Sequence, residues 1–202
     1  MKLYFAPNTR SVRIAWLLEE LGLEYELERF QLGDRAMREP EYLAVHPLGR
    51  VPALEDGDVM LFESGAIVQY LLARYGEGRF NPAPDSPAFP AYLQWLHYAE
   101  GMIMPPINII VVETILLPPE RRNETNVKRA QKLLNQMLTA VDAQLADRDY
   151  LAGEFSGADI MTGHASHVSQ AMLKIDYSDK PNLAAYVERL RARPAFQKVL
   201  SL

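Results

Sequence analysis

The sequence predicts an α/β domain followed by an all-α helical bundle. Short apolar segments alternate with helical patterns over residues 1–76. Glycine and proline then punctuate residues 77–90, which indicates a linker. Residues 91–202 contain helical patterns and no convincing strand pattern. The sequence therefore predicts two domains, at 1–76 and 91–202, joined by the linker at 77–90.

The first domain is expected to follow the order β-α-β-α-β-β-α. Apolar residues recur at helical spacing over Ser11–Leu21, and Gly22 ends that helix. Asp56-Gly57-Asp58 separates two short apolar runs and therefore indicates a hairpin. We expect two βαβ-type crossovers, an antiparallel edge pair and helices on both faces of the sheet. The expected strands cover residues 3–5, 25–30 and 51–54 and the run after residue 58, and the other helices lie within 34–44 and at 65–75.

The second domain is expected to be a bundle of helices. Pro105-Pro106 is expected to kink or end the first of them. Ser156 and Asp159 have the spacing of a capping box, with Phe155 in the position of a staple residue, so we interpret them as structural. The expected helices are Tyr92–Met104, Asn126–Leu145, Asp159–Leu173 and Leu183–Arg191.

The composition excludes several classes of function. The 202 residues carry 21 Lys and Arg against 26 Asp and Glu, a net charge of −5, and no basic stripe, so no nucleic-acid partner is expected. The absence of cysteine excludes disulfides, thiolate metal sites and a cysteine nucleophile. The apolar run Ile107–Leu117 is short and interrupted, and the N-terminus shows no long apolar signal segment. We therefore expect a cytoplasmic protein with no membrane partner.

The histidines do not form an evident metal site. His164 and His167 are spaced i, i+3, as are His97 and Glu100, but neither pair has a third ligand nearby in the sequence. Surface or capping roles on helices are favoured over metal binding, and no metal is expected.

Four motifs span nearly the whole chain: Arg10–Arg13 with Trp16–Glu20, His46–Leu54, Glu63–Ile67 and Phe155–Ile160. In their residues and their order they resemble the motifs of the cytosolic glutathione transferase family. The resemblance is to bacterial-type, theta- or nu-like members, with the class open. It implies a thioredoxin-like first domain, glutathione as cosubstrate and a homodimer.

The resemblance also implies a glutathione-binding set in the first domain. Pro52 is expected to follow a cis peptide bond that exposes the backbone N–H and C=O of Val51 to the ligand. Ser64, as the N-cap of a helix, is expected to bind the γ-glutamyl carboxylate, and Glu63 the ammonium. Without the resemblance, an ordinary trans proline and a plain helix cap would be favoured. Arg50, and less strongly Arg35, are candidates for the glycine carboxylate.

The group that activates the thiol is the open part of the prediction. The family activates the thiol by a hydrogen bond that favours the thiolate, often from a serine at the end of the first strand. Ala6 stands at the corresponding position and has no hydroxyl. The alternatives are ranked Thr9 and Asn8 first, then Ser11, then Tyr4; for Thr9, a helix cap is an equally good interpretation.

A second pocket, for a hydrophobic electrophile, is expected between the domains. Its candidates are Tyr98, Met102, Met104 and Pro105, although each alone is more typical of a helical core. The resemblance implies an enzyme in which the glutathione thiol attacks an electrophile, a peroxide or a disulfide. The absence of cysteine argues against the branches that use their own thiol. The alternative is a non-catalytic glutathione-binding or regulatory protein that retains the fold.

Overall fold

A computed structural model describes all 202 residues, and its contacts divide the chain into two compact units. The first comprises Met1–Asn81 together with Arg191–Leu202, and the second comprises Pro82–Leu190. The expected second domain at 91–202 differs from this division at its C-terminal end. The final residues belong with the α/β unit, not with the helical one.

Packing of the last helix on the first explains this difference. Helix α9 (Pro194–Leu200) contacts α1 (Ser11–Leu21), and the ring of Phe196 stacks on that of Trp16 with centroids 4.2 Å apart. Arg193 also forms two hydrogen bonds to the Glu20 carboxylate, at 2.6 and 2.8 Å. Because these partners lie at opposite ends of the chain, the order of elements along the sequence does not reveal the contact.

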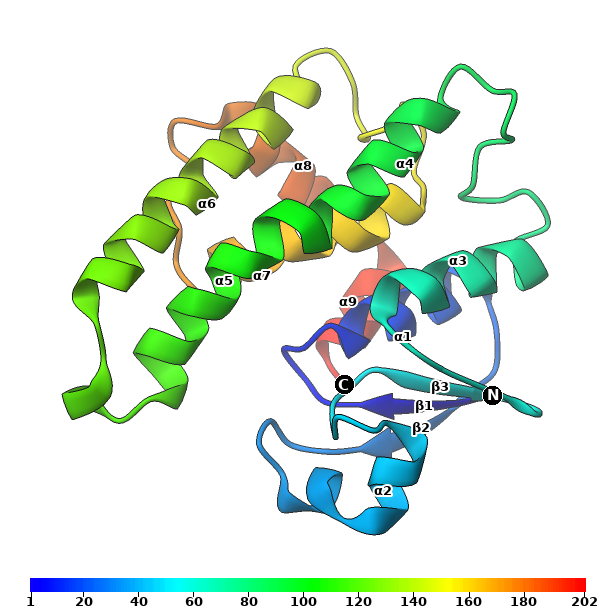
Figure 1. The fold of residues 1–202 in the computed structure, drawn as a ribbon. Helices are drawn as coiled ribbons and strands as arrows, with labels where there is room; N and C mark the ends of the chain where they lie inside the picture. The colour runs from blue at the N-terminus through cyan, green and yellow to red at the C-terminus, as the bar shows by residue number, and fades with distance from the viewer. The chain divides into compact units, whose positions relative to one another are not determined.

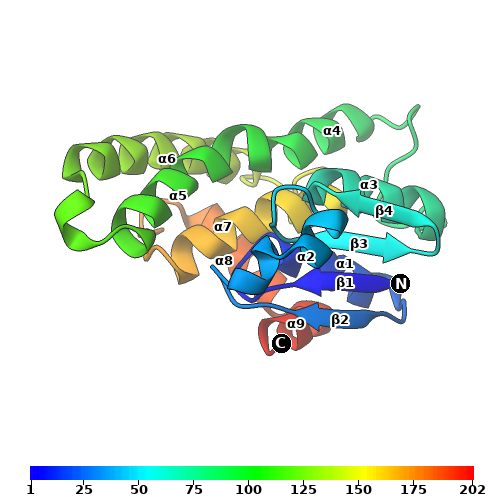
Figure 2. The ribbon, with the colours of Figure 1, turned by 60° about the horizontal axis from the view of Figure 1, so that its bottom comes forward.

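The first unit contains a four-stranded sheet in the order β2-β1-β3-β4 (Figure 2). Strands β1 and β2 are parallel, whereas β3 is antiparallel to both β1 and β4. The expectation of two βαβ crossovers is therefore wrong for the second connection. After β2 the chain stays at the carboxyl end of that strand, so β3 enters the sheet there and runs back. The strands are β1 (Lys2–Phe5), β2 (Glu26–Arg29), β3 (Ala53–Asp56) and β4 (Val59–Phe62).

Helices cover both faces of this sheet. Figure 1 shows α1 and α3 (Ser64–Tyr75) on one face and α2 (Pro40–Val45) on the other. Helix α1 keeps its predicted bounds and ends at Gly22, whose φ of 72° is the left-handed conformation that glycine adopts readily. A short 3-10 helix, η1 (Arg35–Arg38), precedes α2.

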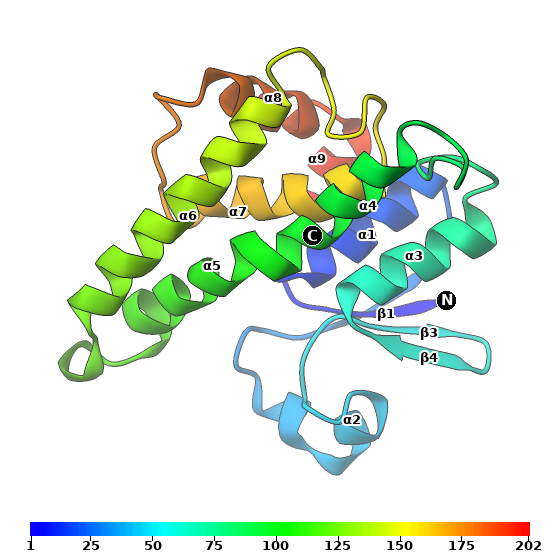
Figure 3. The ribbon, with the colours of Figure 1, turned by 45° about the horizontal axis from the view of Figure 1, so that its top comes forward.

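The second unit is entirely helical (Figure 3). Pro105 and Pro106 lie in the first turn of α5, where backbone N–H groups need no helical partner, so the helix continues through them. A π-helical segment, η2, interrupts the α-helical pattern just before α5. The elements are α4 (Phe89–Tyr98), η2 (Ala99–Ile103), α5 (Met104–Val111), η3 (Val112–Leu116), η4 (Pro119–Arg121), α6 (Glu124–Gln144), η5 (Asp159–Gly163), α7 (His164–Ala171) and α8 (Pro181–Arg191).

Together, α4, η2, α5 and η3 form one helical run, Phe89–Leu116, of 28 residues. By length and composition alone this run would suffice to cross a membrane, which the prediction for the shorter stretch Ile107–Leu117 did not anticipate. Core helices meet the same criterion of length and composition. Leu96, Ile103 and Ile107 on this run are fully or almost fully buried.

Candidate functional site

The sheet brings four segments together at one of its ends. Phe5 pairs with Arg29 in the parallel pair, so the carboxyl ends of β1 and β2 lie side by side. Tyr4 pairs with Ala53, which in turn pairs with Phe62, so the start of β3 and the end of β4 lie at that same end. The segments that leave or enter the sheet there contain the predicted residues Asn8, Thr9, Ser11, Arg35, Arg50, Val51, Pro52, Glu63 and Ser64.

Val51 provides a free backbone edge at this end. The Val51–Pro52 peptide bond is cis, and Val51 lies just outside β3. Its N–H and C=O form no backbone hydrogen bond with the rest of the chain. Continuing the β3–β4 register places Val51 opposite Ser64. An extended peptide lying between them can therefore pair with the Val51 backbone as an added strand.

The start of α3 has a positive electrostatic potential, which comes from unpaired backbone N–H groups and the helix dipole. Glu63, not Ser64, occupies the N-cap position, with a φ of 76°, and makes no capping hydrogen bond through its side chain. The first helical hydrogen bond runs from Ile67 N–H to Glu63 C=O. The N–H groups of Ser64, Gly65 and Ala66 therefore have no helical acceptor, and the positive end of the helix dipole points the same way.

Ser64 does not cap the helix as predicted. It is the first residue of α3, and its Oγ accepts a hydrogen bond from Arg13 Nη1 at 3.1 Å instead of capping the helix. Both side chains are buried, and Arg13 is fully so. Arg13 thus adds a buried positive charge directly behind the start of α3. Sequence reasoning missed this role, although an arginine inside an otherwise apolar helix was a signal for it.

The loop His46–Arg50, which leads into Val51, is held by several contacts. The Tyr42 hydroxyl donates to the Arg50 carbonyl at 2.6 Å, and Leu48 N–H donates to His46 Nδ1 at 3.2 Å. Gly49 has a φ of 56°, and a Cβ there would come within 2.1 Å of the Met37 carbonyl oxygen, so only glycine fits. The backbone of the loop is fixed, whereas the Arg50 side chain is exposed.

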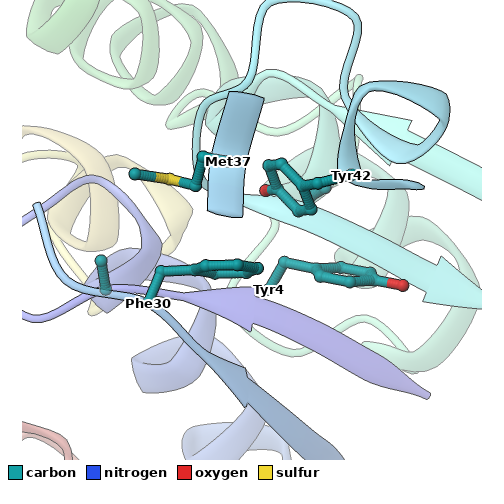
Figure 4. Packing of buried hydrophobic residues seen from close by; sticks show 6 residues of the cluster. Tyr4, Phe30, Met37 and Tyr42 are labelled. Carbon is teal, nitrogen blue, oxygen red and sulfur yellow. The ribbon is translucent and has the colours of Figure 1, made fainter. Parts of the chain in front are cut away.

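Aromatic packing supports this loop from below. The Tyr42 ring lies 4.7 Å from that of Phe30 and 5.5 Å from that of Tyr4, between centroids, and Met37 completes the cluster (Figure 4). Burial raises the pKa of Tyr42 well above its usual value, so its hydroxyl remains a donor to the loop. Arg35, the weaker candidate for the glycine carboxylate, lies exposed on η1 beyond the cluster.

The loop after β1 holds the candidates for thiol activation, and their hydroxyl protons are already in use. Thr9 Oγ1 and Ser11 Oγ donate to the Ala6 carbonyl at 2.7 and 2.9 Å and lie 2.7 Å from each other. Ser11 Oγ also accepts from Ala6 N–H at 3.0 Å. Each hydroxyl has a single proton, and both protons are directed into the loop. Thr9 and Ser11 therefore serve the loop structure in this conformation.

Asn8 differs from both hydroxyl residues. It is exposed, its φ of 60° is left-handed, and its side-chain amide makes no hydrogen bond within the protein. The amide N–H groups are free to donate to a ligand. Asparagine tolerates this backbone conformation better than most residues, which explains the residue type.

Tyr4 points toward the opposite end of the sheet. Its hydroxyl donates to Glu55 Oε2 at 3.3 Å, and Glu55 pairs with Lys2 at the amino end of β1. Its ring belongs to the aromatic cluster beneath the loop (Figure 4). The Tyr4 ring therefore lies beneath these segments, but its hydroxyl is directed away from the other candidates for thiol activation.

The four residues predicted for the second pocket lie on α4, η2 and α5 in environments of two kinds. The Tyr98 hydroxyl donates to the Met137 carbonyl at 3.1 Å, and Met104 is buried. Met102 is 42% exposed, and Pro105 is exposed as well. Tyr98 and Met104 therefore have contacts typical of a helical core, whereas Met102 and Pro105 are accessible. No group of three or more His, Asp and Glu side chains in the protein is placed to hold a metal ion.

Comparison with protein families identifies the class. Residues 1–73 match the glutathione S-transferase N-terminal domain, and residues 103–194 match the glutathione S-transferase C-terminal domain. The two matches cover most of the chain, in the order that the fold shows. The chain belongs to the glutathione S-transferase family.

Individual relatives are found in plants and bacteria. The chain is 35% identical to glutathione S-transferase 4 of Zea mays, over 90% of this chain and 83% of the relative. It is 31% identical to glutathione S-transferase GstB of Escherichia coli K12, over 96% and 94%. Among solved structures, it matches a ternary complex of BphK, a bacterial glutathione transferase, with a TM-score of 0.86 and 30% identity over 100% and 98%. The transferase URE2P6 of Phanerochaete chrysosporium, solved with oxidized glutathione, matches with a TM-score of 0.88 and 26% identity over 99% and 94%.

Proposed function

We propose that the end of the sheet described above binds glutathione and activates its thiol for attack on a hydrophobic electrophile. One observation carries the proposal: Val51, Glu63 and the start of α3 converge there with complementary chemistry. Glutathione carries an ammonium and a carboxylate on the same γ-glutamyl residue. An exposed carboxylate beside a positive helix start is a matched pair for those two charges.

Each part of the ligand then has a partner. The Val51 backbone pairs with that of the cysteinyl residue, as an added strand would. The free N–H groups of α3, with Arg13 behind them, hold the γ-glutamyl carboxylate, and Glu63 holds the ammonium. Arg50, with an exposed side chain on a fixed loop, is our first candidate for the glycine carboxylate, and Arg35 is the second.

Asn8 is our first candidate for thiol activation, ahead of Thr9 and Ser11. Its free amide donates a hydrogen bond to the sulfur, and the nearby start of α1 adds a favourable potential, so the pKa of the bound thiol falls. The thiol proton leaves to solvent. The thiolate then forms a bond from sulfur to the electrophilic carbon, and the leaving group departs with its bonding electrons.

Two variants test the activating group. Asn8→Ala is expected to raise the pKa of bound glutathione by about one unit and to lower kcat/KM about tenfold, as loss of one charge-assisted hydrogen bond implies. Thr9→Ala is expected to leave that pKa unchanged and to cost about 1 kcal/mol of stability. Ultraviolet absorbance of the thiolate during a pH titration measures both pKa values. The opposite pattern would transfer the role to Thr9.

Measurements of turnover test the hypothesis that the protein is an enzyme. With glutathione, the protein is expected to consume a chromogenic aryl halide, an organic peroxide or a small disulfide faster than the uncatalysed reaction. If calorimetry shows glutathione binding while none of the three reacts above background, the protein is a glutathione-binding or regulatory protein instead.

We also propose that Tyr98, Met102, Met104 and Pro105 contribute to the electrophile pocket. The exposed side chain of Met102 and the adaptability of methionine support this assignment. Met102→Ala is expected to raise the KM for the electrophile severalfold and to leave glutathione affinity unchanged. An equal change in both constants would argue against the assignment.

A homodimer in the cytoplasm completes the proposal. Exposed apolar side chains occur in both units, among them Leu48 and Phe62 in the first and Ile109 and Val112 in the second. Sedimentation is expected to show a dimer that Leu48→Lys weakens. A monomer at micromolar concentration would argue against it.

A further inference from the structure

His46 makes a hydrogen bond that requires its neutral form. Its Nδ1 accepts the N–H of Leu48 at 3.2 Å, which closes a turn over His46-Pro47-Leu48. The turn is reinforced by Gly49 N–H, which donates to the His46 carbonyl at 2.8 Å. A protonated imidazole has two N–H donors and no acceptor, so it would face the Leu48 donor with a second donor.

The surroundings of the His46 ring favour the neutral form as well. The side chain is 5% exposed, and the ring packs on that of Phe62, with centroids 4.7 Å apart. Burial is the main effect and lowers the pKa of His46; Glu63 and a hydrogen bond to the His46 backbone oppose it, and Arg50 lowers the pKa slightly further. Arg38, which donates to the Leu48 carbonyl at 3.2 Å, is a further cation on this loop. The surroundings of the His46 ring therefore favour the neutral imidazole, in which Nδ1 is a hydrogen-bond acceptor.

The turn leads directly into the residues proposed to bind glutathione. Arg50 and Val51 follow it, while Phe62, on which the ring packs, immediately precedes Glu63. Movement of the imidazole would disturb both sides of the ligand together. We propose that neutral His46 is a positioning residue for glutathione, one that holds the loop His46–Arg50 in its binding conformation, so that acid weakens binding. This inference rests on the proposed function.

The direction of the pH effect follows from the depressed pKa of His46. Above the ordinary histidine pKa of about 6.5, the turn is closed and binding is at full strength. As the pH falls through the lower pKa of His46 in the folded protein, the closed fraction decreases, and the apparent affinity decreases in proportion. One pH unit below that pKa, binding is about tenfold weaker.

Calorimetric titration of the full-length protein with S-methylglutathione tests the inference. This probe has no thiol, so titration of the sulfur does not contribute. His46→Asn supplies a side-chain oxygen that accepts the same bond without titrating near neutrality. The matched control is His97→Asn, which removes an exposed histidine on α4. The expected result between about pH 7.5 and about pH 5 is a loss of at least threefold in affinity for the wild type and for His97→Asn, with a flat profile for His46→Asn.

A second variant and a spectroscopic readout separate positioning from general stability. His46→Ala is expected to weaken binding about tenfold at both pH values, and Asn at the same position to restore it. The midpoint of the wild-type affinity profile should coincide with the NMR titration midpoint of the His46 ring. The inference is overturned if His46→Asn keeps the wild-type pH profile. If the wild type binds no glutathione derivative at pH 7.5, it is the proposed function that fails.

Discussion

Two helix starts in this protein combine a serine with an acidic residue, and they are built in opposite ways. The start of α3 in the α/β unit has Glu63 before Ser64, and the start of the η5–α7 segment in the helical unit has Ser156 before Asp159. At α3 the carboxylate is exposed and makes no cap. At η5 the carboxylate is completely buried.

The helix start at Asp159 is closed by its own side chains. The Asp159 carboxylate accepts hydrogen bonds from Leu151 N–H at 3.1 Å, Ser156 N–H at 2.9 Å and the Tyr186 hydroxyl at 2.7 Å. Ser156 Oγ in turn accepts from Ala158 N–H at 3.3 Å. This reciprocal arrangement is the capping box that the sequence predicted. Nothing at this start remains available for a ligand, so its contribution is to stability.

The start of α3 keeps its donors free. Glu63 turns away from the helix through its positive φ, and Ser64 Oγ is occupied by Arg13. No carboxylate of the chain caps the start of α3, so its free N–H groups can bind a carboxylate from outside the protein. We propose that the same residue types serve stability where the carboxylate is buried and ligand recognition where it is exposed.

The largest effect is expected on the free energy of unfolding when the Asp159 carboxylate is removed. Asp159→Ala leaves four buried donors without an acceptor, among them the Ser156 hydroxyl, and loss of such a network typically costs about 3 to 5 kcal/mol. Urea unfolding measures this loss. Asp147→Ala, at an exposed position of the same unit, is the matched control and is expected to change stability by less than about 0.5 kcal/mol. A loss below about 1 kcal/mol for Asp159→Ala would contradict the assignment.

A substitution of Glu63 at the start of α3 is expected to weaken glutathione binding and to leave stability nearly unchanged. Glu63→Gln removes the charge proposed to pair with the ammonium, which is worth about 2 to 3 kcal/mol, or roughly 30- to 160-fold in the Kd for glutathione. Stability should be nearly unchanged because Glu63 is exposed. Glu77→Gln is the matched control, since Glu77 is also an exposed glutamate with a positive φ, beyond the other end of α3. Equal affinities for the two variants would remove Glu63 from the site.

Much of the fold was predictable because local chemistry determines it. The apolar spacing and Gly22 define α1, and the Asp56–Asp58 turn defines the β3–β4 hairpin. The spacing of Ser156 and Asp159 was sufficient to predict their network. The four motifs were sufficient to predict the family, which the domain matches confirm.

The contacts that the sequence did not predict join distant parts of the chain or depend on which group donates the proton in a hydrogen bond. Strand β3 runs antiparallel to β1 because the chain stays at the carboxyl end of β2 before it enters the sheet again. Helix α9, at the C-terminal end of the sequence, packs on α1 near its beginning. The arginine among the apolar residues of α1 indicated a buried role for Arg13 but did not identify Ser64 as its partner. No local pattern indicated that His46 would accept a backbone N–H. Placing Asn8 ahead of Thr9 requires knowing that the Thr9 hydroxyl already donates its proton to the Ala6 carbonyl.

The smallest effect expected from the comparison of the two helix starts concerns the charge of Asp159 itself. Burial raises the pKa of Asp159 to about 6, and its four hydrogen bonds only partly oppose that shift. A carboxyl whose pKa is raised in the folded state adds stability at low pH and loses that contribution as the pH rises from about 4 to about 6. Asp159→Asn lacks this titration. The gap in unfolding free energy between wild type and Asp159→Asn should therefore be about 2 kcal/mol wider at about pH 4.5 than at about pH 7. Urea unfolding at both pH values measures the gap. A constant gap would show that the hydrogen bonds hold Asp159 at an ordinary pKa, and burial would then not be what determines its charge.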